Sequence, residues 1–210
     1  MYILILDTAT KRLSASLLDV LSEQTLAYYK ETQDENSHAR KINMVIQDLL
    51  IQAKIEIKQL SAIAVNQGPG SFTGLRVGSS TSKGLCFALD IPLIAICGLT
   101  AYVKYLYEVK ATDVTDIFVL MDARRGNYFY SHLNQSRQLS STLFKHITDI
   151  ETEIYLSRNP WVYYLEKGND IELSAKDLTK AVLEKWNNKD FVDIRSFEPE
   201  YIVNNYIAKK

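Results

Sequence analysis

The apolar and polar positions in the first half of the chain follow, in turn, the spacing of strands and the spacing of helices. Apolar runs or alternation predict strands over residues 1–6, 13–19, 26–32, 61–65 and 93–97. A helical stripe follows the capping-type residues 34–37 and consists of Ile42, Val45, Ile46, Leu49, Leu50 and Ala53. Two further helices are predicted over residues 72–88 and 99–107. The resulting order, βββαβαβα, is typical of an α/β fold with a mixed sheet covered by helices.

A polar and charged stretch over residues 108–115 separates this part from a second unit. In the second unit we predict strands over residues 117–121, 128–133, 143–147 and 161–165. Helices are predicted over residues 150–157 and 174–186. The predicted division is therefore 1–108 and 109–210. Both parts open with an apolar strand that ends in an aspartate, Asp7 or Asp122, followed by a polar turn and another strand.

Composition limits the function classes. The chain has 210 residues, 47% of them hydrophobic, and a net charge of −1, which predicts a substantial core and argues against autonomous binding of nucleic acid. Arg124 and Arg125 are candidates for binding a phosphate or a partner's carboxylate, and Lys209-Lys210 for a weak contact with RNA, although solvated charges are the default. No segment resembles a signal peptide or a membrane span, and Cys86 and Cys97 form no close-spaced pair. We therefore expect reduced thiols and a cytoplasmic protein.

The most distinctive segment is the glycine-rich turn Asn66-Gln67-Gly68-Pro69-Gly70-Ser71-Phe72-Thr73-Gly74, between a predicted strand and a predicted helix. The first N–H groups of a helix have no internal partner, so such a turn can bind an anion. It can equally be a tight packing corner. The spacing matches neither a Walker A loop nor a dinucleotide fingerprint. Ser80-x-x-Lys83 matches a serine hydrolase pattern without its partner motifs, which favours a structural role for both residues.

Two helix faces indicate close packing against another element. On the helix over residues 72–88, small and apolar residues recur at three- and four-residue steps, and interior glycines cost a helix about 1 kcal/mol each. The packing partner is either the sheet of the same domain or a helix of another chain. Met44 and Ile51 lie opposite the apolar stripe of the preceding helix, as in a docking surface. The predicted interface residues are Met44, Ile51, Phe72, Leu75, Gly78, Ser79, Ser82 and Leu85.

Four segments together resemble the TsaB (YeaZ) family. They are Ile5-Leu6-Asp7-Thr8-Ala9-Thr10, the glycine-rich turn as far as Arg76, Asp122-Ala123-Arg124-Arg125-Gly126, and Glu198-Pro199-x-Tyr201-x-x-x-Asn205. Residues 150–190 offer no match. The resemblance implies the fold of actin, sugar kinases and heat-shock chaperone ATPases (ASKHA), with two subdomains, of which the second is degenerate.

The resemblance also implies a function. Members of this family are regarded as non-catalytic scaffolds in the synthesis of threonylcarbamoyladenosine at position 37 of tRNAs that read codons beginning with A. They bind the transferase TsaD, a paralogue, through their first two helices, and the ATPase TsaE joins the complex. The implied partners are a TsaD-like protein, a TsaE-like ATPase, tRNA through the complex, and a second copy when the chain is alone. No cofactor is implied.

Individual residues bear on two catalytic alternatives, a metallopeptidase and a kinase or ATPase. The paralogue TsaD carries a His-x-x-x-His pair for a metal on its first helix, whereas here His38 is followed four positions later by Ile42. This weakens a metallopeptidase, and we expect no metal site. Asp7, Thr8 and Asp122 are the candidates for a vestigial phosphate site of a kinase or ATPase. We favour the alternative that each aspartate caps the turn after its strand, because no glycine-rich adenosine-binding segment follows in the second half.

Overall fold

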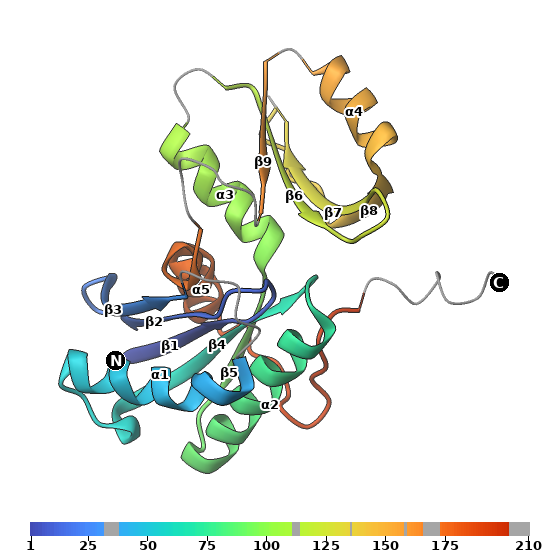
Figure 1. The fold of residues 1–210 in the computed structure, drawn as a ribbon. Helices are drawn as coiled ribbons and strands as arrows, with labels where there is room; N and C mark the ends of the chain where they lie inside the picture. Colours follow the sequence, from blue (N-terminus) through green and yellow to red (C-terminus); the bar gives the residue numbers. More distant parts are fainter. Residues whose placement is uncertain (32–37, 111–113, 135, 158, 166–172, 202–210) are drawn as a thin grey trace.

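A computed structural model describes residues 1–31, 38–110, 114–134, 136–157, 159–165 and 173–201. They form two lobes, each built on a mixed sheet (Figure 1). The capping-type residues 34–37, the tail residue Asn205 and the Lys209-Lys210 pair lie outside the described residues. The predicted α/β class with mixed sheets is confirmed.

The first sheet has the strand order β3-β2-β1-β4-β5. Its strands are β1 (Tyr2–Asp7), β2 (Ser14–Asp19), β3 (Gln24–Lys30), β4 (Leu60–Gly68) and β5 (Leu93–Cys97). β1 pairs antiparallel with β2 and parallel with β4, and β4 pairs parallel with β5. Both parallel strands β1 and β4 are therefore central, and their carboxyl ends lie at one edge of the sheet.

Helices cover both faces of this sheet (Figure 1). α1 (His38–Ala53) and α2 (Phe72–Leu89) share a core with Leu4 and Leu6, whereas α3 (Gly98–Lys110) shares a core with Ile3 and Ile5. The predicted stripe of α1 is confirmed, since Ile42, Val45, Ile46, Leu49 and Leu50 are buried. A short 3-10 turn, η1 (Ile57–Gln59), leads from α1 into β4.

The second sheet has the order β8-β7-β6-β9. Its strands are β6 (Asp116–Asp122), β7 (Asn127–Leu133), β8 (Leu143–His146) and β9 (Pro160–Tyr164), and α4 (Ile147–Leu156) follows β8. Phe118, Leu120 and Tyr130 form a core with Ile150 of α4 on one face of this sheet. Ile117 and Val119 point to the other face, into the core that contains α3. Helix α3 therefore packs against both sheets.

The last described segment packs on the first lobe, whereas the predicted division 1–108 and 109–210 placed it in the second unit. η2 (Ala175–Leu178) and α5 (Thr179–Asn187) pack on the α3 side of the first sheet. The Ala175 N–H donates to Ser14 Oγ at 2.9 Å, and Val192 forms an antiparallel bridge with Leu93 of β5. Ala175, Leu178 and Val182 of this segment are buried in the core that contains α3.

The small-residue face of α2 packs within the first lobe, and its glycines Gly74 and Gly78 approach Thr8 of the β1–β2 turn. Leu75, Gly78, Ser79 and Ser82 are buried, and a side chain at Gly78 would overlap the Thr8 hydroxyl. These four predicted interface residues are therefore not at the surface, and contact within the same domain accounts for the stripe. Leu85 is half-buried, so Phe72 is the exposed member of the predicted set on α2.

Two glycines of α2 test this packing as a matched pair. Gly74→Ala places a methyl group against the Thr8 carbonyl oxygen, whereas a methyl group at Gly84 meets no atom within 4 Å. We expect Gly74→Ala to lower the free energy of unfolding by about 1–3 kcal/mol, because backbone must move. We expect Gly84→Ala to raise it by about 0.5–1 kcal/mol through helix propensity. Urea denaturation followed by circular dichroism measures both, and equal effects would contradict the close approach.

Candidate functional site

The carboxylate of Asp7, at the end of β1, is buried and fully engaged by the chain itself. Only 3% of the residue is exposed. Oδ1 accepts hydrogen bonds from the Ala9 N–H at 2.9 Å and from Asn66 Nδ2 at 3.0 Å, and Oδ2 accepts one from the Tyr102 hydroxyl. The bonds come from the β1–β2 turn, β4 and α3, so Asp7 joins three elements that are distant in the sequence.

The groups around Asp7 complete a buried polar network. Asn66 Oδ1 accepts hydrogen bonds from the N–H groups of Gly68 at 3.1 Å and Gly98 at 3.0 Å. Burial, and then the neighbouring Asp7 carboxylate, hold the pKa of Tyr102 well above its ordinary value, so the phenol keeps its proton and remains a donor. A phosphate or a metal-bound phosphate would therefore have to approach a carboxylate that is buried and already accepts three hydrogen bonds.

The second aspartate is arranged differently. Asp122 is exposed at the end of β6, and its Oδ1 accepts a hydrogen bond from the Arg124 N–H at 2.7 Å. The Asp7–Ala9 bond has the same two-residue spacing, which confirms that both aspartates cap the turns after their strands. Thr8 is buried, and its Oγ1 lacks a hydrogen-bond partner. The three candidates for a phosphate site thus do not present a common set of open ligands.

The glycine-rich turn is a packing corner. The Ser71 N–H donates to the Ala9 carbonyl oxygen at 2.7 Å, and a side chain at Gly70 would overlap Ala9. Ser71 also caps α2, because its Oγ accepts a hydrogen bond from the Gly74 N–H at 3.3 Å. Lys83, of the hydrolase-like pattern, donates to the Phe197 carbonyl oxygen at 2.9 Å and holds the C-terminal segment. The contacts of Gly70 and Ser71 with Ala9 therefore pack the glycine-rich turn directly against the β1–β2 hairpin.

The three histidines lie in separate environments. His38 is buried at the start of α1, His132 stacks on Phe118 with ring centroids 4.7 Å apart, and His146 caps α4. Ile42 belongs to the core beneath α1. Within the ranges that the structure describes, no group of three or more His, Cys, Asp and Glu side chains could hold a metal ion.

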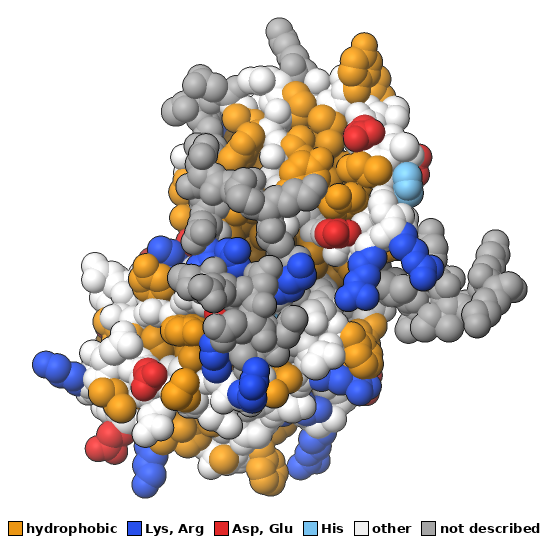
Figure 2. Space-filling model, in the orientation of Figure 1, with side chains coloured by type: hydrophobic (Ala, Val, Ile, Leu, Met, Phe, Trp, Pro, Cys, Tyr) orange, Lys and Arg blue, Asp and Glu red, His pale blue; other side chains and the backbone are white. Residues whose placement is uncertain are grey.

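The outer face of α1 and α2 is the candidate interaction surface. Met44 and Ile51 on α1 are 55% and 65% exposed, and Phe72 on α2 is 55% exposed. Phe87, which the sequence reasoning missed, is 80% exposed and lies on the same side of α2 as Phe72 and Arg76. Its position, fifteen residues after Phe72 on a helix, was the available signal. Figure 2 shows such hydrophobic side chains scattered over this lobe among charged ones.

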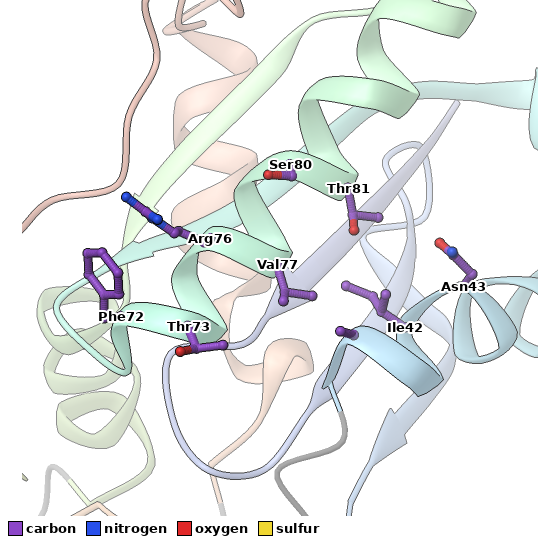
Figure 3. Close-up of a pocket in the computed structure, with 9 residues that line it drawn as sticks. Ile42, Asn43, Phe72, Thr73, Arg76, Val77, Ser80 and Thr81 are labelled. Carbon is purple, nitrogen blue, oxygen red and sulfur yellow. The ribbon is translucent and has the colours of Figure 1, made fainter.

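A shallow groove of about 460 Å³ runs between the two helices (Figure 3). Val77 and Thr81 of α2 face Ile42 and Asn43 of α1, and Phe72 and Arg76 lie close together on the first turns of α2. The groove is lined by Ala39, Ile42, Asn43, Phe72, Thr73, Arg76, Val77, Ser80 and Thr81. The surface therefore combines exposed apolar side chains with a depression that a partner's side chain can enter.

Two lobes on mixed sheets, each opening with a strand, an aspartate-capped turn and a second strand, define an ASKHA-type protein. Within the described ranges, no helix combines the length and apolar character needed to cross a membrane. A family model described as "TsaD: tRNA N6-adenosine threonylcarbamoyltransferase" matches residues 24–195.

Proteins of one name match almost the whole chain. The "tRNA threonylcarbamoyladenosine biosynthesis protein TsaB" of Haemophilus influenzae is 32% identical over 99% of this chain and 96% of its own length. The Escherichia coli protein of the same name is 22% identical over 100% of this chain and 98% of its own. The structure "YeaZ from Pseudomonas aeruginosa" has a TM-score of 0.75 and 21% identity over 96% of this chain and 99% of that chain. The chain belongs to the TsaB (YeaZ) family of tRNA threonylcarbamoyladenosine biosynthesis proteins.

The hydrogen bond from Tyr102 to Asp7 generates a stability prediction. Tyr102→Phe leaves the buried carboxylate without one donor, and we expect the free energy of unfolding to fall by about 1.5–3 kcal/mol. Tyr107→Phe is the matched control on the same helix, because the Tyr107 hydroxyl accepts an exposed hydrogen bond from Arg137 Nε. We expect the control to change stability by less than about 0.5 kcal/mol. Identical denaturation midpoints for both variants would show that the buried bond contributes nothing.

Proposed function

We propose that the chain is a non-catalytic subunit that binds a TsaD-like paralogue through the outer face of α1 and α2. In this role it supports the threonylcarbamoylation of adenosine 37 in tRNAs that read codons beginning with A. The observation that carries the proposal is the exposure of Met44, Ile51, Phe72 and Phe87 on two neighbouring helices. Several large apolar side chains exposed on two adjacent helices are a feature of surfaces that bind another protein.

The absence of catalysis in this proposal is supported by the state of Asp7. A carboxylate that positions a metal–phosphate complex must be open to that ligand, whereas Asp7 is buried and accepts three hydrogen bonds from the chain. The helix position four residues after His38 is Ile42, which is a core residue rather than a second imidazole. A kinase or ATPase would need the Asp7 carboxylate to be open, and a metallopeptidase of this type would need a second imidazole in place of Ile42.

The remaining partners belong to the same proposal. A TsaE-like ATPase joins the complex, and tRNA is contacted through the complex. In isolation the uncovered apolar face of α1 and α2 pairs with a second copy, because a two-fold axis can bury the same patch on both chains. A cytoplasmic location is consistent with two free cysteines. Burial raises the pKa of Cys86 to about 11, so this thiol stays protonated and unreactive at neutral pH.

The test of the proposal replaces two exposed residues with charged ones. Met44→Glu combined with Ile51→Glu places two carboxylates on the exposed face of α1 within the proposed contact. We expect the affinity for the purified TsaD-like protein to fall at least about 30-fold, the effect of one hot-spot residue, and tRNA modification in a reconstituted mixture to fall with it. Calorimetric titration gives the affinity, and thermal unfolding should be unchanged because both side chains are exposed.

The matched control is Tyr155→Glu combined with Leu156→Glu on α4. These residues are 88% and 77% exposed on the second lobe, so the change in charge and in exposed apolar area is similar. We expect the control to bind the TsaD-like protein as the unaltered chain does. If the α4 pair abolishes binding and the α1 pair does not, the contact is on the second lobe and the proposed surface is wrong.

A further inference from the structure

Arg76 occupies an unusual position on the α1–α2 surface. It is exposed one turn after Phe72 on α2, and its guanidinium carbon lies 4.2 Å from the centroid of the Phe72 ring (Figure 3). The ring of Tyr201 lies 5.1 Å from the Phe72 ring, tilted by 42°. Cation–π attraction and the aromatic contact therefore hold Arg76, Phe72 and Tyr201 in one cluster beside the groove.

The C-terminal segment fixes the third member of this cluster. The Glu200 N–H donates to the Gln67 carbonyl oxygen at 2.8 Å, and Phe197 is buried in the core under α2. These contacts hold the chain beside the first turn of α2, so Tyr201 lies next to Phe72 as part of the folded lobe.

The charge of Arg76 has no counterpart in the groove. Among the nine residues that line it, Arg76 is the single ionisable one, and the other eight are apolar, amide or hydroxyl side chains. In the part of the chain that the structure describes, Arg76 forms no salt bridge, and its interaction is with the Phe72 ring. A groove whose described lining has one cation and no acid is complementary to a carboxylate flanked by apolar atoms.

We propose that Arg76 is the charged anchor of the docking surface and receives a carboxylate of the TsaD-like partner. The inference rests on the proposed function. A guanidinium that lies on an aromatic ring keeps its edge free, and this edge can donate two parallel hydrogen bonds to one carboxylate. The stacking also holds the side chain in place before binding, which reduces the entropy lost on association. The apolar side chains of α1 and α2 provide the buried area of the interface. Arg76 fixes how the two proteins align and makes binding selective for an acidic residue of the partner.

The experiment measures the dissociation constant for the purified TsaD-like protein at low and at high salt. Arg76→Glu should weaken binding at least about 30-fold, because the partner carboxylate would face a like charge. Arg76→Gln should weaken it less and flatten its salt dependence, since the ionic contribution is gone. Lys189→Glu is the matched control, with the same change in net charge on an exposed residue after α5, on the opposite side of the first sheet. We expect the control to bind as the unaltered chain does.

A charge swap makes the test specific. One Asp→Lys or Glu→Lys substitution in the partner should restore the binding of Arg76→Glu, and failure of every such substitution to do so would overturn the proposal. If Arg76→Glu binds normally while the Met44 and Ile51 pair does not, the surface stands and the role of Arg76 is refuted. If neither affects binding, the proposed function itself fails. If Arg76→Glu weakens self-association alone, the carboxylate belongs to a second copy, which also overturns the proposal.

Discussion

The buried carboxyl group of Asp7 is the constraint on which the two-lobed arrangement depends. It accepts hydrogen bonds from the β1–β2 turn, from Asn66 of β4 and from Tyr102 of α3. Helix α3 packs against both sheets, so the position that Asp7 gives to α3 also positions the second lobe. A buried polar network is stabilising only when its members are satisfied together, which allows β1, β4 and α3 one relative arrangement.

The same network of hydrogen bonds fills the place in the first lobe where a phosphate site was a candidate. The corner at the end of β1 is occupied by the chain's own donors, and the glycine-rich turn is closed by its hydrogen bond to Ala9. What the first lobe leaves open is the outer face of α1 and α2, with exposed Met44, Ile51 and Phe72. The buried hydrogen bonds thus lie at the carboxyl ends of β1 and β4, whereas these exposed apolar side chains lie on α1 and α2.

Helical periodicity predicted α1 well because this helix buries one face. Strands such as β1 and β6 are buried on both faces and were recognised as apolar runs. Periodicity could not predict which surface a stripe packs against, and Gly78 therefore seemed suited to a partner although it packs on Thr8 of its own chain. The return of residues 173–201 to the first sheet was missed for a similar reason, since the bond between Ala175 and Ser14 joins positions far apart in the sequence. Asp7 was recognised as a turn cap, but its bonds to Asn66 and Tyr102 require the folded topology.

The most direct measurement of the central claim is hydroxyl-radical footprinting of side chains, with and without the purified TsaD-like protein. Met44, Phe72 and Phe87 are exposed on α1 and α2, and Tyr155 is exposed on α4 as an internal reference. The account predicts that the partner lowers the oxidation of the first three residues and leaves that of Tyr155 unchanged. Protection of Tyr155 with unchanged oxidation of Met44, Phe72 and Phe87 would contradict it.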